Sequence, residues 1–365
     1  MLRNPTLRGD HFKLGIFAAN CSSGTAATTI PDRWSATWED NLALAKMADE
    51  SGFDFMLPLA RWRGYGGATD FEGSTLETIT WAGGLLAQTK RISVFGTVHA
   101  PLIHPVFAAK QCVTVDHIGS GRFGLNIVCG WNLDEFEMFG IAQREHDERY
   151  AFGQEWWDIV SATWQRQDPF DHKGSYFDLK GVVGHPKPWG GERPIVMNAG
   201  SSGAGRAFAG RNCDVMFTAL IDHERAKKNV AAIKQTTREQ FGRDIGVFTS
   251  GHVVCRPTRK EAEDYYQWYA VEHEDGPAVT RLMELQGLHS QSFPPDVFAT
   301  YRTRFAGGHG SLPIIGTPDE VAAELGRVAG DGFNGAAITM VSYLDQLPFF
   351  IQEVLPRLAH LRRTA

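Results

Sequence analysis

The feature that most constrains the fold is a regular alternation of short apolar runs with longer amphipathic segments along the whole chain. Short, mostly apolar runs are typical of parallel strands buried on both faces. Eight such runs occur, at residues 14–19, 55–60, 92–98, 123–128, 195–199, 214–218, 246–255 and 336–341. Because nearly every run is followed by a helical segment, the pattern predicts an α/β fold, a single (β/α)8 TIM barrel spanning residues 1–365.

The segments between the runs have the periodicity of helices. In the first of them, Leu44, Met47 and Ala48 recur at the spacing of one helical face. Two segments do not fit the repeat, residues 165–193 and 272–312, which are rich in turn-forming or polar residues. We expect these insertions to lie at the C-terminal mouth of the barrel, where long loops shape the active site.

The composition excludes several classes of protein. A hydrophobic fraction of 43% and an aromatic fraction of 11% exclude a disordered chain, and a net charge of −6 argues against nucleic-acid binding. No apolar run reaches the roughly 18–20 residues that a membrane span needs. Residues 1–13 are polar and lack the core of a signal peptide, so we expect a cytoplasmic protein with no membrane partner.

Cysteine and histidine do not form recognisable metal sites. The 5 cysteines are scattered without a C-x-x-C pair, which favours reduced thiols over a disulfide framework or a zinc site. His99, His104 and His117 lack the spacing of known metal motifs, and no carboxylate follows a strand beside them. We therefore expect no metal.

The best candidate anion site is the glycine-rich segment 200–205, which follows a predicted strand and precedes a helix. Its backbone N–H groups and serine hydroxyls can bind a phosphate at the helix N-terminus, although a simple N-capped helix has the same pattern. The dinucleotide pattern G-x-G-x-x-G fails because Phe208 stands at the third glycine position. A mononucleotide phosphate is therefore favoured.

Two further segments can contact a cofactor. Residues 145–150 place Arg149 and Tyr150 at the start of a Trp-rich helix, where they can bind an anion or simply form a capped N-terminus. Residues 60–67 combine two arginines, two aromatic residues and three glycines after the second predicted strand. Such a loop can cover a planar ligand by stacking and hydrogen bonding.

Together these segments resemble the bacterial-luciferase-like FMN-dependent monooxygenases. The resemblance covers residues 12–358 and is carried by 120–128, by Gly130, Trp131 and Glu135, by 146–150 and by 199–202. Within that family the chain is similar to the pyrimidine oxygenase and dimethylsulfone monooxygenase groups. Residues 63–67 are like the former, whereas 20–24 and 145–150 are more like the latter.

The resemblance implies a (β/α)8 barrel with FMN at its C-terminal mouth. It implies a cofactor-binding set that consists of Ala60, Arg61, Asn126, Glu135, Arg149, Tyr150 and Ser202. It also implies a catalytic set of Thr97, Asn126 and Trp131, beside the flavin edge where oxygen reacts. The cofactor would be used as reduced FMN with O2 as co-substrate, and a separate NAD(P)H-dependent flavin reductase would deliver it. The assembly would be a homodimer or a homotetramer.

The implied reaction is the oxygenation or cleavage of a small substrate that is either N-heterocyclic and pyrimidine-like or organosulfur and sulfone-like. Arg61 stands where the pyrimidine oxygenase has lysine, and residues 62–67 depart from the sulfone enzyme. One alternative is a deazaflavin-dependent hydride-transfer oxidoreductase of the same barrel superfamily. Another is a non-catalytic flavin-binding subunit. The residues leave open whether oxygen is carried at C4a or N5 of the flavin.

Overall fold

The structure of the chain is a computed structural model that describes residue 4 and residues 8–289 and 294–362. The described residues form two compact units. The first unit contains Glu77–Thr218 and Ile233–Gly246, and the second contains Gly9–Leu76, Ala219–Ala232 and the described residues from Val247 onward. The helix α7 (His223–Phe241) has residues in both. The prediction that residues 1–365 form one domain stays a prediction.

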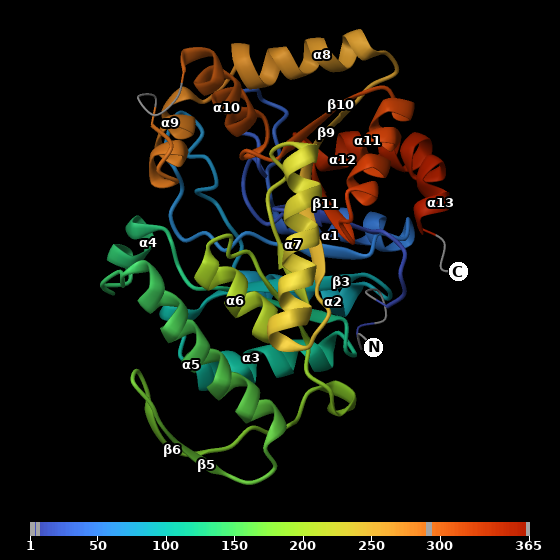
Figure 1. The fold of residues 1–365 in the computed structure, drawn as a ribbon. Coiled ribbons are helices and arrows are strands. Elements are labelled where there is room, and N and C mark those ends of the chain that lie inside the picture. The colour runs from blue at the N-terminus through green and yellow to red at the C-terminus, as the bar shows by residue number, and fades with distance from the viewer. Residues whose placement is uncertain (1–3, 5–7, 290–293, 363–365) are drawn as a thin grey trace. The chain divides into compact units, whose positions relative to one another are not determined.

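The first unit is built on four parallel strands in the order β3-β4-β7-β8. Its helices flank these strands, and α3 packs against α5 (Figure 1). Its elements are α2 (Thr78–Gln88), β3 (Ser93–His99), η2 (Ala100–Leu102), α3 (Pro105–Ile118), β4 (Phe123–Val128), α4 (Leu133–Met138), α5 (His146–Gln165), β5 (Phe170–Lys173), β6 (Asp178–Val182), η3 (Trp189–Gly191), β7 (Ile195–Asn198), α6 (Gly203–Asn212) and β8 (Val215–Phe217).

The strands β5 and β6 form an antiparallel hairpin, and one carboxylate of α5 binds its turn. Glu155 Oε2 accepts hydrogen bonds from the backbone N–H groups of Ser175 (2.9 Å) and Tyr176 (3.1 Å) in the turn. Glu155 Oε1 accepts from the backbone N–H of Phe177 (2.9 Å) and lies 3.0 Å from His172 Nε2. One side chain of α5 therefore satisfies most of the polar groups of this turn.

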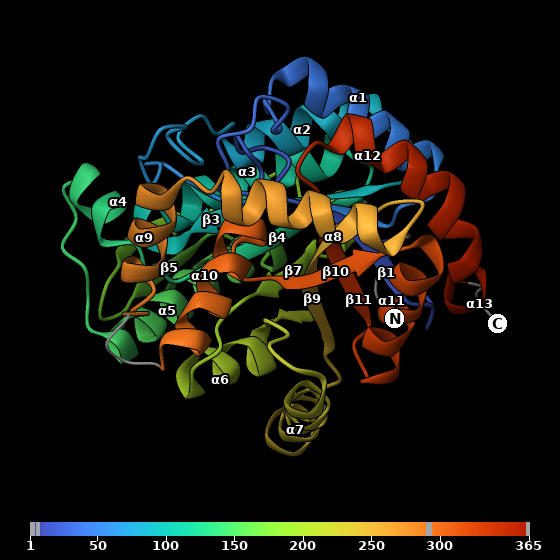
Figure 2. The same cartoon turned by 90° about the horizontal axis from the view of Figure 1, so that it is seen from above.

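The second unit contains parallel strands in the order β10-β9-β11-β1-β2. The helix α8 packs on β10, as Figure 2 shows. Its elements are β1 (Lys13–Phe17), α1 (Trp38–Glu50), β2 (Phe55–Leu57), β9 (Gly246–Cys255), α8 (Arg259–Gln267), the π-helix η4 (Trp268–Glu272), α9 (Gly276–Leu285), α10 (Pro295–Gly308), β10 (Leu312–Gly316), α11 (Pro318–Gly330), β11 (Gly335–Thr339), α12 (Tyr343–Phe349), the π-helix η6 (Phe350–Val354), η7 (Leu355–Leu358) and α13 (Ala359–Arg362).

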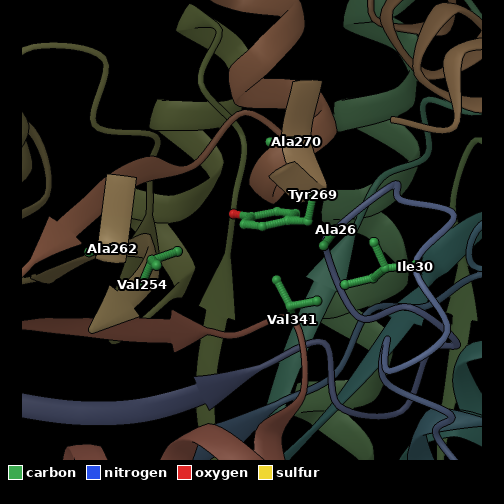
Figure 3. Packing of buried hydrophobic residues seen from close by; sticks show 7 residues of the cluster. All are labelled: Ala26, Ile30, Val254, Ala262, Tyr269, Ala270 and Val341. Atoms are coloured by element: carbon green, nitrogen blue, oxygen red, sulfur yellow. The ribbon is translucent and has the colours of Figure 1, made fainter. Parts of the chain in front are cut away.

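Part of the core of the second unit surrounds Tyr269 of η4, whose ring Figure 3 shows beside Ala26, Ile30 and Val341. Its phenol is fully buried and donates a hydrogen bond to the carbonyl of Gly307 at 3.2 Å. The bond satisfies the one polar group that the ring takes into the apolar cluster.

All eight predicted strands are present in the described part of the chain, as β1, β2, β3, β4, β7, β8, β9 and β11. The sequence did not indicate β10, which lies beside β9, or the hairpin of β5 and β6. The reason is visible in their residues. Buried and partly exposed residues alternate along β10, which also contains Pro313, and β5 and β6 are mostly polar and exposed, so neither has a continuous apolar run.

Two findings concern membrane-spanning helices and the cysteines. Among the residues that the structure describes, no helix is long and apolar enough to cross a membrane. All five cysteines are free thiols and buried.

Close packing between β1 and β2 gives a stability prediction. A methyl group added at Gly15 would lie 2.5 Å from ring carbons of Phe55, on the paired strand. We expect Gly15→Ala to lower the free energy of unfolding by about 1–3 kcal/mol, because the core cannot expand without strain. Urea denaturation followed by circular dichroism measures this. Gly330→Ala is the matched control, because nothing lies within 4 Å of that position and alanine is the better helix former. Equal stability of the two variants would contradict the prediction.

Candidate active site

The strands β3 and β4 place two polar side chains opposite each other near their C-terminal ends. Thr97 and Asn126 are register partners, and Asn126 Nδ2 donates a hydrogen bond to Thr97 Oγ1 at 3.2 Å. Asn126 is 7% exposed, and its Oδ1 has no hydrogen-bond partner among the described residues. A buried amide oxygen without a partner is costly, so this atom is suited to accept a hydrogen bond from a ligand.

A buried imidazole and a buried carboxylate, those of His99 and Glu135, follow Thr97 and Asn126 along the chain. His99 ends β3, and its Nε2 is 3.9 Å from Oε2 of Glu135, which α4 carries. The two residues are 5% and 2% exposed. The side chain of Asn132 caps α4 by accepting from the N–H of Asp134, which fixes the start of the helix. His99 is not among the predicted site residues, because a metal-ligand role was considered for it from the sequence and rejected.

The segment between β4 and α4 contains Trp131, which is partly buried. Its carbonyl accepts a hydrogen bond from Gln143 Nε2 at 3.1 Å. The carbonyl of the preceding Gly130 accepts from Arg149 Nη1 at 2.7 Å, which ties this segment to α5. Arg149 Nε is buried and has no hydrogen-bond partner among the described residues. An arginine held in this way can offer its remaining donors to an anion.

The N-terminus of α6 forms a narrow cradle with Tyr150 of α5. Ser202 caps the helix by accepting from the backbone N–H of Gly205 at 3.1 Å. A methyl group added at Gly200 or Gly205 would lie 2.5 or 2.6 Å from the Tyr150 hydroxyl oxygen. Only glycine therefore lets the phenol approach this turn. Burial raises the pKa of Tyr150, and its hydrogen bond with Ser202 acts in the opposite direction. The phenol stays protonated at neutral pH and can donate a hydrogen bond.

Asn198, the last residue of β7, holds the turn that leads into this cradle. Its Nδ2 donates to the carbonyl of Ile127 at 2.7 Å, and its Oδ1 accepts from the N–H of Gly200 at 2.8 Å. Asn198 stands at the end of a predicted strand, but the sequence assigned it no cofactor or catalytic role. The amide side chain joins β4 to the glycine turn.

The remaining predicted residues, Ala60 and Arg61, follow β2 in the second unit. Ala60 is partly buried, and Arg61 is 6% exposed. Arg61 Nε lies 2.9 Å from Oε2 of Glu72, and the guanidinium lies over the ring of Tyr65, 4.8 Å from its centroid. His309 Nδ1 approaches the other oxygen of Glu72 at 3.0 Å. No sequence pattern indicated Glu72 or His309, which are 237 residues apart.

The first unit thus brings several predicted residues together. It pairs Thr97 with Asn126 and Tyr150 with Ser202, and it places Arg149 against the residue that precedes Trp131. The cofactor and catalytic roles of these residues stay predictions. Within residues 8–289 and 294–362, no three His, Cys, Asp or Glu side chains have an arrangement suited to a metal ion.

Comparison with known proteins shows which family this chain resembles. A family model described as luciferase-like monooxygenase matches residues 12–335. Pyrimidine monooxygenase RutA of Escherichia coli (strain K12 / DH10B) is 29% identical over 369 aligned residues, which cover 98% of this chain and 95% of that protein.

Two solved structures match the fold over nearly the whole chain. One is riboflavin lyase (RcaE) with modified FMN and the substrate riboflavin, with a TM-score of 0.85 at 23% identity, covering 97% of this chain and 93% of that one. The other is DmoA from Hyphomicrobium sulfonivorans, with a TM-score of 0.85 at 20% identity, covering 98% and 89%. With the eight predicted strands present, the predicted (β/α)8 barrel fold is confirmed.

Proposed function

The chain belongs to the luciferase-like monooxygenase family, and from this premise we propose that it is the oxygenase of a two-component system. The family makes it an oxygenating, flavin-dependent oxidoreductase. In our proposal it uses reduced FMN and O2 to oxygenate or cleave a small substrate that is pyrimidine-like or sulfone-like. The similarity to pyrimidine monooxygenase RutA supports the first substrate class.

The observation that carries the choice of FMN is the glycine cradle around Tyr150. Its hydroxyl and that of Ser202 stand at the N-terminus of the ten-residue helix α6, where backbone N–H groups and the helix dipole favour an anion. Arg149 adds a positive charge from the adjacent position in α5. We assign Arg149, Tyr150 and Ser202 to the phosphate end of FMN.

We propose the other predicted residues as contacts to the rest of the cofactor. Asn126, whose buried Oδ1 lacks a partner among the described residues, would bind the flavin ring, and Glu135 would bind the cofactor from α4. Ala60 and Arg61 are the contacts that we propose from the loop after β2. The assignments of Asn126, Glu135 and Arg61 rest on the resemblance and on the burial of their side chains, and that of Ala60 rests on the resemblance.

When bound, reduced FMN would supply the electrons that activate O2. In our proposal, Thr97 and the amide of Asn126 hydrogen-bond the reacting edge, at a buried position where fixed dipoles stabilise developing charge more strongly than water does. Trp131 would limit the access of water to that edge, which protects the reaction from uncoupling.

We further propose that a separate NAD(P)H-dependent flavin reductase delivers the reduced FMN and that the enzyme is a homodimer or homotetramer. Both proposals follow from the resemblance to two-component monooxygenases. A coupled assay with a generic flavin reductase and NADH tests the first, and sedimentation velocity tests the second.

An anaerobic titration with reduced FMN, followed by rapid mixing with oxygenated buffer, tests the proposed function. We expect saturable binding, and oxidation that is slower on the protein than for free reduced FMN. Binding of a reduced deazaflavin in place of FMN would replace the proposal with hydride transfer. Activity that appears only after a second barrel subunit is added would favour a non-catalytic role.

The cradle makes a separate prediction about the phosphate. We expect Gly205→Ala to weaken FMN binding at least about tenfold and to leave riboflavin binding nearly unchanged, because the added methyl displaces the Tyr150 hydroxyl. Gly203→Ala, in the same helix turn, is the matched control, since a methyl group added there would have no neighbouring heavy atom within 4 Å. Fluorescence titration of both flavins measures the effect. Equal losses for FMN and riboflavin would remove the phosphate from this cradle.

A further inference from the structure

The loop after β2 contains a buried charged cluster that the family assignment does not explain. We call it the Arg61 cluster, and it consists of Arg61, Glu72 and His309. Glu72 is fully buried, with one carboxylate oxygen 2.9 Å from Arg61 Nε and the other 3.0 Å from His309 Nδ1. The cluster therefore joins the loop to the end of α10, at the far end of the 272–312 insertion.

The backbone at both ends of the Glu72–His309 contact adopts an uncommon conformation. Glu72 has a φ of 57° and His309 a φ of 53°, both in the left-handed region that residues with side chains rarely adopt. Around them, Tyr65 stacks on Phe71 at 5.8 Å and meets the His309 ring edge-on at 6.1 Å. The surroundings thus hold the carboxylate in a strained but well-packed position.

The neighbours of Glu72 favour its ionised form. Burial alone would raise the pKa of Glu72, but His309 and Arg61 outweigh that effect and hold its pKa below the usual value. The carboxylate is therefore ionised at neutral pH. A fully buried ionised carboxylate is costly unless its partners are fixed, so Glu72 and Arg61 constrain each other's orientation.

A second contact holds the same loop without involving Arg61. Asp275, just before α9, accepts hydrogen bonds from the backbone N–H groups of Ala68 (3.0 Å) and Thr69 (2.8 Å). Loop anchoring alone is thus already provided by a different carboxylate at the near end of the insertion. The Arg61 cluster adds something that Asp275 does not, a fixed direction for one guanidinium.

We propose that Glu72 is a positioning residue that orients the guanidinium of Arg61 for the flavin, with His309 holding the carboxylate from its other side. This inference rests on the proposed function, in which Arg61 contacts the flavin. The guanidinium lies over the ring of Tyr65, 4.8 Å from its centroid, and its Nε is bound to Glu72, so its direction is set before a ligand arrives. Binding then avoids the entropy cost of ordering a long side chain.

A double-mutant cycle on reduced-FMN affinity tests the inference, with Glu72→Gln and Arg61→Met measured singly and together by anaerobic titration. If Glu72 acts through Arg61, Glu72→Gln weakens binding about tenfold in the wild-type background and less than about twofold in the Arg61→Met background. The same factor in both backgrounds would overturn the inference, because it would mean that Glu72 supports the fold and not the guanidinium.

Two further variants keep the test decisive. His309→Gln, run through the same cycle, should show the same loss of effect when Arg61 is replaced, and it decides the question if Glu72→Gln fails to fold. Asp275→Asn is the control, and we expect its effect on affinity to be equal in both Arg61 backgrounds. A wild-type chain that binds no reduced FMN would overturn the proposed function, whereas normal wild-type binding with an additive cycle would overturn only the role of Glu72.

Discussion

Asn126→Ala should reduce turnover by about 10²–10³-fold, the loss typical for one polar group that stabilises a reacting centre. Its amide is buried between β3 and β4, donates to Thr97 Oγ1 and carries an oxygen with no partner among the described residues. Alanine removes both the donor and the acceptor. Rapid mixing of the reduced-FMN complex with oxygen, with quantification of product and hydrogen peroxide, measures the change.

The control for this variant is Asn41→Ala, which removes another fully buried asparagine, in α1. Asn41 Nδ2 donates to the carbonyl of Thr37, a bond internal to the helix start, so its loss should reduce stability and leave turnover per folded molecule unchanged. Unchanged turnover in Asn126→Ala, with the protein folded, would remove Asn126 from the reaction.

Acidification should destabilise the protein through His252. This residue of β9 is 1% exposed, its Nδ1 lies 2.8 Å from Thr339 Oγ1, and its Nε2 has no partner among the described residues. Burial lowers its pKa to about 3, from an ordinary value near 6.5. The imidazole is therefore neutral in the folded state, and its contribution to stability is complete above pH 6.5.

The sign of the effect follows from proton binding. Between pH 6.5 and pH 3 the unfolded chain binds a proton at His252 that the folded chain does not, so stability falls as the pH falls, by about 1.4 kcal/mol per pH unit. In His252→Asn, the unfolding free energy between pH 6.5 and pH 4.5 should fall less steeply with falling pH than in the wild type, by about 1.4 kcal/mol per pH unit. Exposed His360→Asn serves as control and should keep the wild-type slope. An identical slope in all three proteins would show that His252 titrates normally.

The strands of the barrel could be predicted because strands buried on both faces appear in the sequence as short, mostly apolar runs. The strand β4 was expected at 123–128 and is found at Phe123–Val128, and β9 agrees equally well. Residues buried on both faces are mostly apolar or small, so the run itself marks the strand. The strand β10 was not predicted because buried and partly buried residues alternate along it.

The candidate site was predictable only where it lies next to a strand end or a helix start. Thr97 and Asn126 follow this rule, and parallel register then makes them neighbours. Glu72 and His309 do not, because their contact depends on two residues in the left-handed conformation and on a chain separation of 237 residues. No local pattern distinguishes such a carboxylate from a solvated one in a loop, so only the folded structure reveals it.

The attachment of the β5–β6 hairpin through Glu155 has a consequence for protein engineering. Glu155 of α5 receives three backbone N–H groups of the hairpin turn, and the ring of Phe152 on the same helix contacts Tyr176 and Phe177, so one short stretch of α5 attaches the turn. Hairpins of different length and composition could be grafted in place of residues 170–182, provided that the graft presents the same three amides to Glu155 and an aromatic ring to Phe152. The scaffold thus offers a replaceable arm whose exchange would leave the strand framework intact.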